Sequence, residues 1–181
     1  MTIIAPADSD EMKQLMPLTV DHSGPIYIRL AKGYDPIVSN NNMPFKIGKA
    51  IPMTEGNDAL IVTTGITLKI ALDASNSLKD QGIQLSVLHM PTIKPLDIKS
   101  FMDYANQIKV VIAIEEHSIV GGLGSSISEI ISESNFKQPK RFKRLGLPDV
   151  FPDEYGSQTT LMERYMITKD HLINTIKELL S

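Results

Sequence analysis

Short, almost wholly apolar runs alternate along most of the chain with segments whose apolar residues recur at helical spacing. The runs rich in Val, Ile and Leu predict strands over residues 59–64, 84–89 and 109–114, and residues 141–147 are predicted to form a fourth strand. The periodic segments predict helices over residues 67–80, from Pro95 past Tyr104, 124–134 and 169–180. Strands that are apolar throughout are typical of a parallel sheet covered on both faces. The pattern therefore predicts an α/β fold, a three-layer α/β/α arrangement around an open, mainly parallel sheet.

The first part of the chain follows a different pattern. Residues 7–16 predict one helix with Asp8 or Ser9 as its cap, and residues 25–30 predict one strand. One helix and one strand cannot bury a core of their own, so this part must pack against something else. The Asn- and Pro-rich segment that follows, residues 35–44, is typical of a linker.

We therefore divide the chain into an N-terminal unit (residues 1–38), a linker (39–45) and one complete domain (46–181). The complete domain contains the regular alternation of strands and helices, and is long enough to enclose a core. The N-terminal unit is too short to fold by itself.

Composition excludes several classes of function. The chain has 181 residues, no cysteine and a formal net charge of −3. It can form neither disulfides nor a thiolate metal site, and it lacks a cysteine nucleophile. The charge offers no basic face for nucleic acid or an anionic membrane. Neither an apolar run long enough to span a membrane nor a signal peptide is present. We expect a cytoplasmic protein that binds neither nucleic acid nor membrane.

A glycine cluster follows the predicted strand 109–114. The segment Gly122-Leu123-Gly124-Ser125-Ser126-Ile127 nearly matches a dinucleotide-binding fingerprint, but isoleucine replaces the third glycine. These glycines also follow the strand by several residues, and no Lys-Ser or Lys-Thr pair of a phosphate loop comes after them. The alternative is that the glycines let the loop turn sharply and the next helix pack close to the sheet. The residues favour this second interpretation.

Glu115, Glu116 and His117 lie where the same strand ends, at the edge where open sheets place ligands and interfaces. They are candidates for an acid/base cluster, since histidine titrates near neutrality, or for an interface without proton transfer. Only Glu115 and His117 share a side of the strand, and two ligands are too few for a metal ion. The other histidines show no ligand spacing, so no metal site is predicted.

Two cations follow the first predicted strand. Arg29 and Lys32 lie next to Gly33, where a flexible strand end can bring positive charge to a phosphate. The alternative is ordinary surface charge.

In order along the chain, several segments resemble the transketolase family of thiamine-diphosphate enzymes. The resemblance covers almost the whole chain. Each segment alone is not specific for the family, but the occurrence of all of them in this order is. The matching segments are Pro6-Ala7-Asp8-Ser9-Asp10-Glu11, Gly24-Pro25-Ile26-Tyr27-Ile28-Arg29-Leu30, Gly48-Lys49-Ala50, Asp58 to Gly65, Ile93-Lys94-Pro95-Leu96-Asp97, and Glu115-Glu116-His117-Ser118 with Gly121-Gly122-Leu123-Gly124.

The resemblance implies that residues 1–38 are the end of a pyrimidine-binding domain and residues 46–181 a transketolase C-terminal domain, which helps to hold the family's dimer together. In this family the cofactor lies between a diphosphate-binding and a pyrimidine-binding domain. The glutamate that activates it and the magnesium motif have no counterpart in this sequence. Thiamine diphosphate and magnesium are therefore expected only in the assembled enzyme, with another polypeptide supplying the missing domains in a homo- or hetero-oligomer.

The resemblance also bears on the substrate. Family members that use sugar phosphates hold the phosphate with basic residues, some near the end of the pyrimidine-binding domain, and Arg29 and Lys32 match that neighbourhood. Deoxyxylulose phosphate synthases typically carry an arginine shortly before Lys-Pro-Leu-Asp, where this chain has Pro91. That departure weakens the synthase interpretation and leaves the broader transketolase interpretation intact.

The chain is thus interpreted as the C-terminal part of a transketolase-like transferase that moves two-carbon ketol units between sugar phosphates. It would contribute assembly surface and phosphate contact but no catalytic residue, and would be inactive alone. Two alternatives remain. One is the tail of the β-subunit of a thiamine-diphosphate 2-oxo acid dehydrogenase. The other is a non-catalytic oligomerisation or binding module.

Overall fold

The protein was analysed as a computed structural model, which describes residues 1–33, 35–39 and 43–181. Its main sheet has five strands in the order β3-β5-β4-β7-β8. Their bounds are β3 (Ile51–Thr54), β4 (Ala59–Thr63), β5 (Leu85–His89), β7 (Val110–Ser118) and β8 (Arg141–Leu147). Neighbouring strands are parallel except for the antiparallel edge strand β3. The predicted open, mainly parallel sheet is confirmed.

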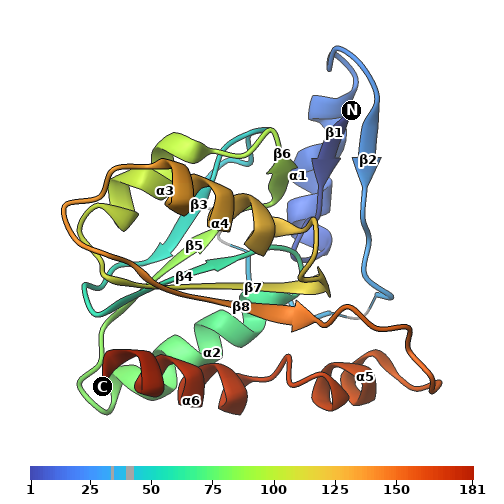
Figure 1. Ribbon diagram of the computed structural model, residues 1–181. Coiled ribbons are helices and arrows are strands. Elements are labelled where there is room, and N and C mark those ends of the chain that lie inside the picture. Colours follow the sequence, from blue (N-terminus) through green and yellow to red (C-terminus); the bar gives the residue numbers. More distant parts are fainter. Residues whose placement is uncertain (34, 40–42) are drawn as a thin grey trace.

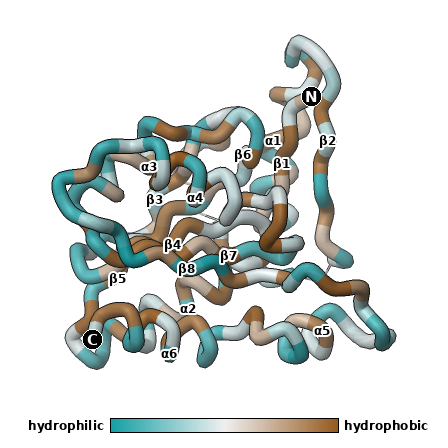
Figure 2. Tube along the Cα trace, in the orientation of Figure 1, coloured by the Kyte–Doolittle hydropathy of each residue, from teal (hydrophilic) through white to brown (hydrophobic). Residues whose placement is uncertain are grey.

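Helices cover both faces of this sheet (Figure 1). Helices α2 (Thr67–Lys79) and α6 (Lys169–Leu180) pack on one face, and α3 (Ile98–Ala105) and α4 (Leu123–Glu133) pack on the other. The alternation of side chains along β4 explains the two cores. Ile61 faces α2 and α6, whereas Leu60 and Val62 face α3 and α4. Figure 2 shows the hydrophobic residues concentrated along the central strands. The three-layer α/β/α fold is confirmed.

A second, three-stranded sheet has the order β2-β1-β6. Strand β1 (Thr2–Ile4) pairs in parallel with β2 (Ile26–Ile28) and antiparallel with β6 (Thr92–Lys94). Helix α1 (Ser9–Thr19) packs beside it in a small core formed by Ile4, Leu15, Phe45 and Ile51. The N-terminal unit thus packs against the main domain, and β2 pairs with a single strand among the described residues (Figure 1).

Strands β1, β3 and β6 and helix α5 (Gln158–Arg164) were not predicted from the sequence. The three strands have only three or four residues, too few to show a period. Proline interrupts β3 at Pro52, which suits its place at the edge of the sheet. The predicted place of Pro95 in a first helical turn is wrong. This proline precedes Asp97, which caps α3 by accepting a hydrogen bond from the N–H of Ser100.

The domain boundaries were drawn from sequence alone and stay predictions. Residues 40–42 of the predicted linker lie outside the described part of the chain. Within the described residues, no helix is both long and apolar enough to cross a membrane.

Candidate anion site at the carboxyl edge of the sheet

The parallel strands β4, β5, β7 and β8 all end at one edge of the main sheet, where loops of the N-terminal unit cross them. The N–H of Ala5 donates to the carbonyl of Pro91 at 2.8 Å, and the N–H of Gly65 donates to the carbonyl of Ala5 at 3.1 Å. The N–H of Arg29 donates to the carbonyl of Ile4 at 2.8 Å. These bonds fix the exit of β2, and with it Arg29, against the end of β4.

A buried pair reinforces this seam, by which we mean the contact between the N-terminal unit and the carboxyl edge of the main sheet. The Nε2 atom of His89, at the end of β5, lies 3.1 Å and 3.2 Å from the two carboxylate oxygens of Glu11 on α1. Glu11 also accepts a hydrogen bond from the N–H of Ala7. Both side chains are almost completely buried, so the pair joins the N-terminal unit to the domain core. The Nδ1 atom of His89 has no hydrogen-bond partner among the described residues.

Glu115 lies at the N-terminus of α4 and is buried. One of its carboxylate oxygens accepts from the N–H of Leu123 at 2.8 Å, and the other accepts from the N–H of Gly124 at 2.7 Å. A carboxylate at a helix N-terminus satisfies free backbone donors and interacts favourably with the helix dipole. The chain thus fills with its own side chain the position that a bound phosphate would take in a nucleotide site.

The glycines of the 122–127 segment make this arrangement possible. A Cβ atom on Gly122 would lie 2.1 Å from a carboxylate oxygen of Glu115, and a Cβ atom on Gly124 would lie 2.8 Å from the side chain of Arg144. The structure therefore supports close packing, and not dinucleotide binding, as the role of these glycines.

The neighbours of Glu115 have separate surroundings. The half-buried Glu116 accepts a hydrogen bond from Gln158 Nε2 at 2.9 Å. His117 is exposed, and its Nδ1 atom lies 4.0 Å from Glu115. Because Glu115 already accepts two backbone bonds, the triplet is split between a structural carboxylate, a second carboxylate at the sheet edge and a surface imidazole. A role for these residues at a site edge or interface stays a prediction.

Arg29 and Lys32, the two predicted phosphate contacts, lie in different surroundings. Arg29 lines a small cavity together with Gly65, Ile66 and Glu116. A Cβ atom on Gly65 would lie 3.9 Å from Nη2 of Arg29, which places the guanidinium beside the start of α2. Lys32 is exposed and is not among the residues that line this cavity. The structure thus brings Arg29, and not Lys32, to the seam with Glu116.

Helix α2 begins beside Arg29 without the usual features of a helix start. Its N-cap residue, Ile66, offers no side-chain hydrogen bond, and its first turn carries no acidic residue. Thr64, buried just before Gly65, has a hydroxyl without a partner among the described residues. An uncapped N-terminus and a guanidinium side by side favour an anion. No glycine-rich motif marks this start of α2, so it could not be predicted as an anion site from local sequence patterns.

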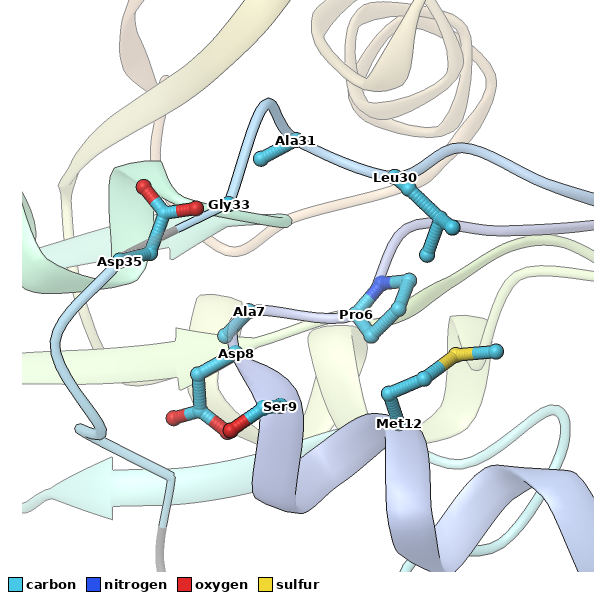
Figure 3. Close-up of a pocket in the computed structure, with 9 residues that line it drawn as sticks. All are labelled: Pro6, Ala7, Asp8, Ser9, Met12, Leu30, Ala31, Gly33 and Asp35. Atoms are coloured by element: carbon cyan, nitrogen blue, oxygen red, sulfur yellow. The ribbon is translucent and has the colours of Figure 1, made fainter.

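A larger cavity of about 300 Å³ lies between the start of α1 and the residues that follow Arg29. Figure 3 shows Leu30, Pro6 and Met12 gathered at one end of it and the carboxylates of Asp8 and Asp35 at the other. No cation is among the described residues that line it, so these residues form a poor site for phosphate.

Asp8 anchors the segment that follows Arg29. Its carboxylate accepts hydrogen bonds from the N–H groups of Glu11 at 3.0 Å, Val38 at 2.8 Å and Ser39 at 2.7 Å. Burial by itself would raise the pKa of Asp8, but these backbone hydrogen bonds outweigh burial and hold the pKa below its ordinary value. The ionised carboxylate thus joins the start of α1 to residues 38–39.

Among the residues that the structure describes, no group of three or more His, Asp or Glu side chains could hold a metal ion. The expectation that thiamine diphosphate and magnesium bind only in an assembled enzyme stays a prediction.

Comparisons with known proteins agree with this architecture. The family described as "Transketolase, C-terminal domain" matches residues 48–172. An uncharacterized transketolase family protein of Sinorhizobium fredii is 38% identical over 98% of this chain and 52% of its own length. A 6-deoxy-6-sulfo-D-fructose transketolase subunit of Clostridium sp. is 34% identical over 98% of this chain and 54% of its own length. The chain thus spans about half the length of these relatives.

A solved structure described as "Split gene transketolase, inactive beta4 tetramer" is also similar, with a TM-score of 0.90 and 31% identity. The match covers 99% of this chain and 58% of that one. These likenesses favour the transketolase interpretation over a 2-oxo acid dehydrogenase tail and over a non-catalytic module. The chain belongs to the transketolase family and is a C-terminal part of a transketolase-like protein.

Proposed function

We propose that this chain is one half of a split transketolase-like transferase that moves two-carbon ketol units between sugar phosphates. A second polypeptide would supply the diphosphate-binding domain and most of the pyrimidine-binding domain. The relatives that support this are about twice as long, and the names of some describe subunits or a split gene. The assembled enzyme would be a cytoplasmic homo- or hetero-oligomer, a dimer of such units being the simplest form.

The observation that carries the proposal is the incomplete N-terminal unit. Strand β2 pairs with one strand only among the described residues, and an open strand edge is a template for pairing with another chain. Large apolar side chains of the unit are also exposed, among them Met16, Leu18, Val20 and Tyr27. A pyrimidine-binding domain that continues the β2-β1 sheet would cover these groups.

Further apolar side chains are exposed beyond the carboxyl edge of the main sheet. Phe151 and Tyr155, in the segment between β8 and α5, are almost wholly exposed, and Val150 is exposed beside them. Exposed aromatic residues are typical of protein interfaces. We assign this segment to the assembly surface of the enzyme.

In the assembled enzyme, thiamine diphosphate with magnesium would supply the electron sink for two-carbon transfer. This chain would bind the anionic end of the sugar. The guanidinium of Arg29 would donate hydrogen bonds to it, and the uncapped start of α2 would add favourable electrostatics. Lys32, exposed nearby, would add positive charge in a more weakly defined position.

Reconstitution tests the proposal. The chain, the polypeptide encoded next to its gene and the mixture of the two should each be assayed with thiamine diphosphate, magnesium, a ketose phosphate and an aldose phosphate. Two-carbon transfer is expected in the mixture only. Transfer by this chain alone, or no transfer in a mixture that forms a stable complex, would contradict the proposal.

A further inference from the structure

The small cavity at the seam brings two opposite charges together. Its lining includes Arg29 from the N-terminal unit, Gly65 and Ile66 at the start of α2, and Glu116 from β7. Its volume is about 10 Å³, roughly the space of one water molecule. A phosphate or sulfonate group is too large to enter it, but a group that Arg29 holds at its rim would lie close to Glu116.

The two charges do not neutralise each other directly. No ion pair within 4.0 Å joins Arg29 and Glu116, and the Arg29 guanidinium has no hydrogen-bond partner among the described residues. Glu116 uses its Oε1 atom to accept from Gln158, at 2.9 Å. Both side chains are half-buried, so their interactions are less screened than those of surface charges.

Glu116 should weaken the binding of an anion in proportion to the negative charge of that anion. An anion bound by Arg29 is attracted by the guanidinium and repelled by the carboxylate across the cavity. By Coulomb's law in a water-like medium, each negative charge of a ligand about 6 Å from Glu116 weakens binding roughly threefold. The penalty is therefore about threefold for a monoanion and about ninefold for a dianion.

We propose that Glu116 is a specificity-determining residue that favours a singly charged group over a doubly charged one at Arg29. The preferred ligands are sugars that end in a sulfonate or in a singly protonated phosphate. This inference rests on the proposed function, because it requires that Arg29 binds the anionic end of the substrate. It adds a residue of the C-terminal domain to the substrate site.

Two small anions test the inference on the full chain. At pH 8 methyl phosphate is a dianion and methanesulfonate is a monoanion. Each is titrated into ¹⁵N-labelled protein while the Gly65 amide and the Arg29 Nε–H signals are followed by NMR. Glu116→Gln removes the charge but keeps an oxygen that can accept from Gln158. Glu178→Gln, at the exposed end of α6, is the matched control for net charge.

In Glu116→Gln we expect affinity for methyl phosphate to rise about ninefold and affinity for methanesulfonate about threefold. Glu178→Gln should change neither. Equal changes for the two anions, or a Glu178→Gln effect of the same size, would overturn the role of Glu116. Neither result would bear on the proposed two-carbon transfer, which the reconstitution assay tests separately. No shift of the Gly65 or Arg29 signals with either anion, in the original protein and in Glu116→Gln, would overturn both this inference and the role of Arg29.

Discussion

Two helices begin at the same edge of the main sheet, and their N-termini differ. Helix α4 starts in a glycine-rich segment, and the buried carboxylate of Glu115 already occupies its first turn. Helix α2 has Ile66 as its N-cap residue and no side-chain cap, and it starts beside the guanidinium of Arg29, which has no partner among the described residues. The helix whose sequence resembles a phosphate-binding motif is therefore closed to ligands. The helix without a motif is the one placed to meet an anion.

The comparison shows why glycine spacing alone is a weak guide. Glycine permits close approach of any group to a helix start, and in α4 the group is the protein's own Glu115. Whether such a start is free depends on a side chain eight residues earlier in the chain.

Glu115→Ala should have the largest effect on stability, because it leaves the buried N–H groups of Leu123 and Gly124 without an acceptor. A loss of about 3 kcal/mol in the free energy of unfolding is expected, measured by urea denaturation. Because the variant opens the start of α4, phosphate should partly restore its stability and should have a smaller effect on the original protein. An unchanged urea midpoint would contradict the capping role of Glu115.

Gly122→Ala tests the same contact between Glu115 and the start of α4, by changing the helix and leaving the carboxylate in place. The added methyl group would lie 2.1 Å from the Glu115 carboxylate, and the resulting shift of the helix should cost about 1–3 kcal/mol. Gly156→Ala is the control, because its Cβ would meet other atoms only at 3.5 Å or more. Equal urea midpoints for the two variants would show that the packing argument is wrong.

At the open start, Arg29→Ala should act on binding and not on folding. In a reconstituted enzyme the KM for a sugar phosphate should rise roughly tenfold with a smaller change in kcat, because a charge-assisted hydrogen bond contributes about 1.5–3 kcal/mol. Lys32→Ala should change KM by about twofold or less, since exposed charges contribute little. If KM is unchanged in Arg29→Ala, Arg29 is not part of the site.

Of these variants, Asp8→Asn should have the smallest effect, which is on the stability of the fold and is expected only at mildly acidic or neutral pH. The folded protein holds the pKa of Asp8 below the ordinary value of 3.8. The carboxylate therefore stabilises the fold at pH values above about 4, and this contribution is lost as the pH falls through the lowered folded-state pKa. The midpoint temperature of thermal unfolding should fall less steeply between pH 7 and pH 3 in the variant than in the original protein. Parallel curves for the two proteins would rule out this linkage.

The main domain was largely predictable because its strands are long and apolar. Strand β8 and helix α6 match their predicted bounds, and the side chain of Thr168 caps α6. Strands β1 and β6 were not predictable, because three residues each carry no period and their pairing joins segments about 90 residues apart.

The candidate site was only partly predictable, because it also brings together residues that are distant in the sequence. Arg29 follows a recognisable strand, but nothing in its neighbourhood in the sequence indicates Gly65 or Glu116 as its spatial neighbours. The Glu11–His89 pair joins residues 78 positions apart. Such contacts depend on how the N-terminal unit packs on the sheet edge, which local patterns do not encode.

The central claim is that this chain completes a thiamine-diphosphate enzyme only with a partner polypeptide. Calorimetric titration of thiamine diphosphate with magnesium tests it most directly, first into this chain, then into the polypeptide encoded beside its gene, and then into their mixture. We predict saturable binding that is strongest in the mixture and absent with this chain alone. Saturable binding to this chain alone would contradict the claim, and so would a mixture that forms a complex but binds no cofactor.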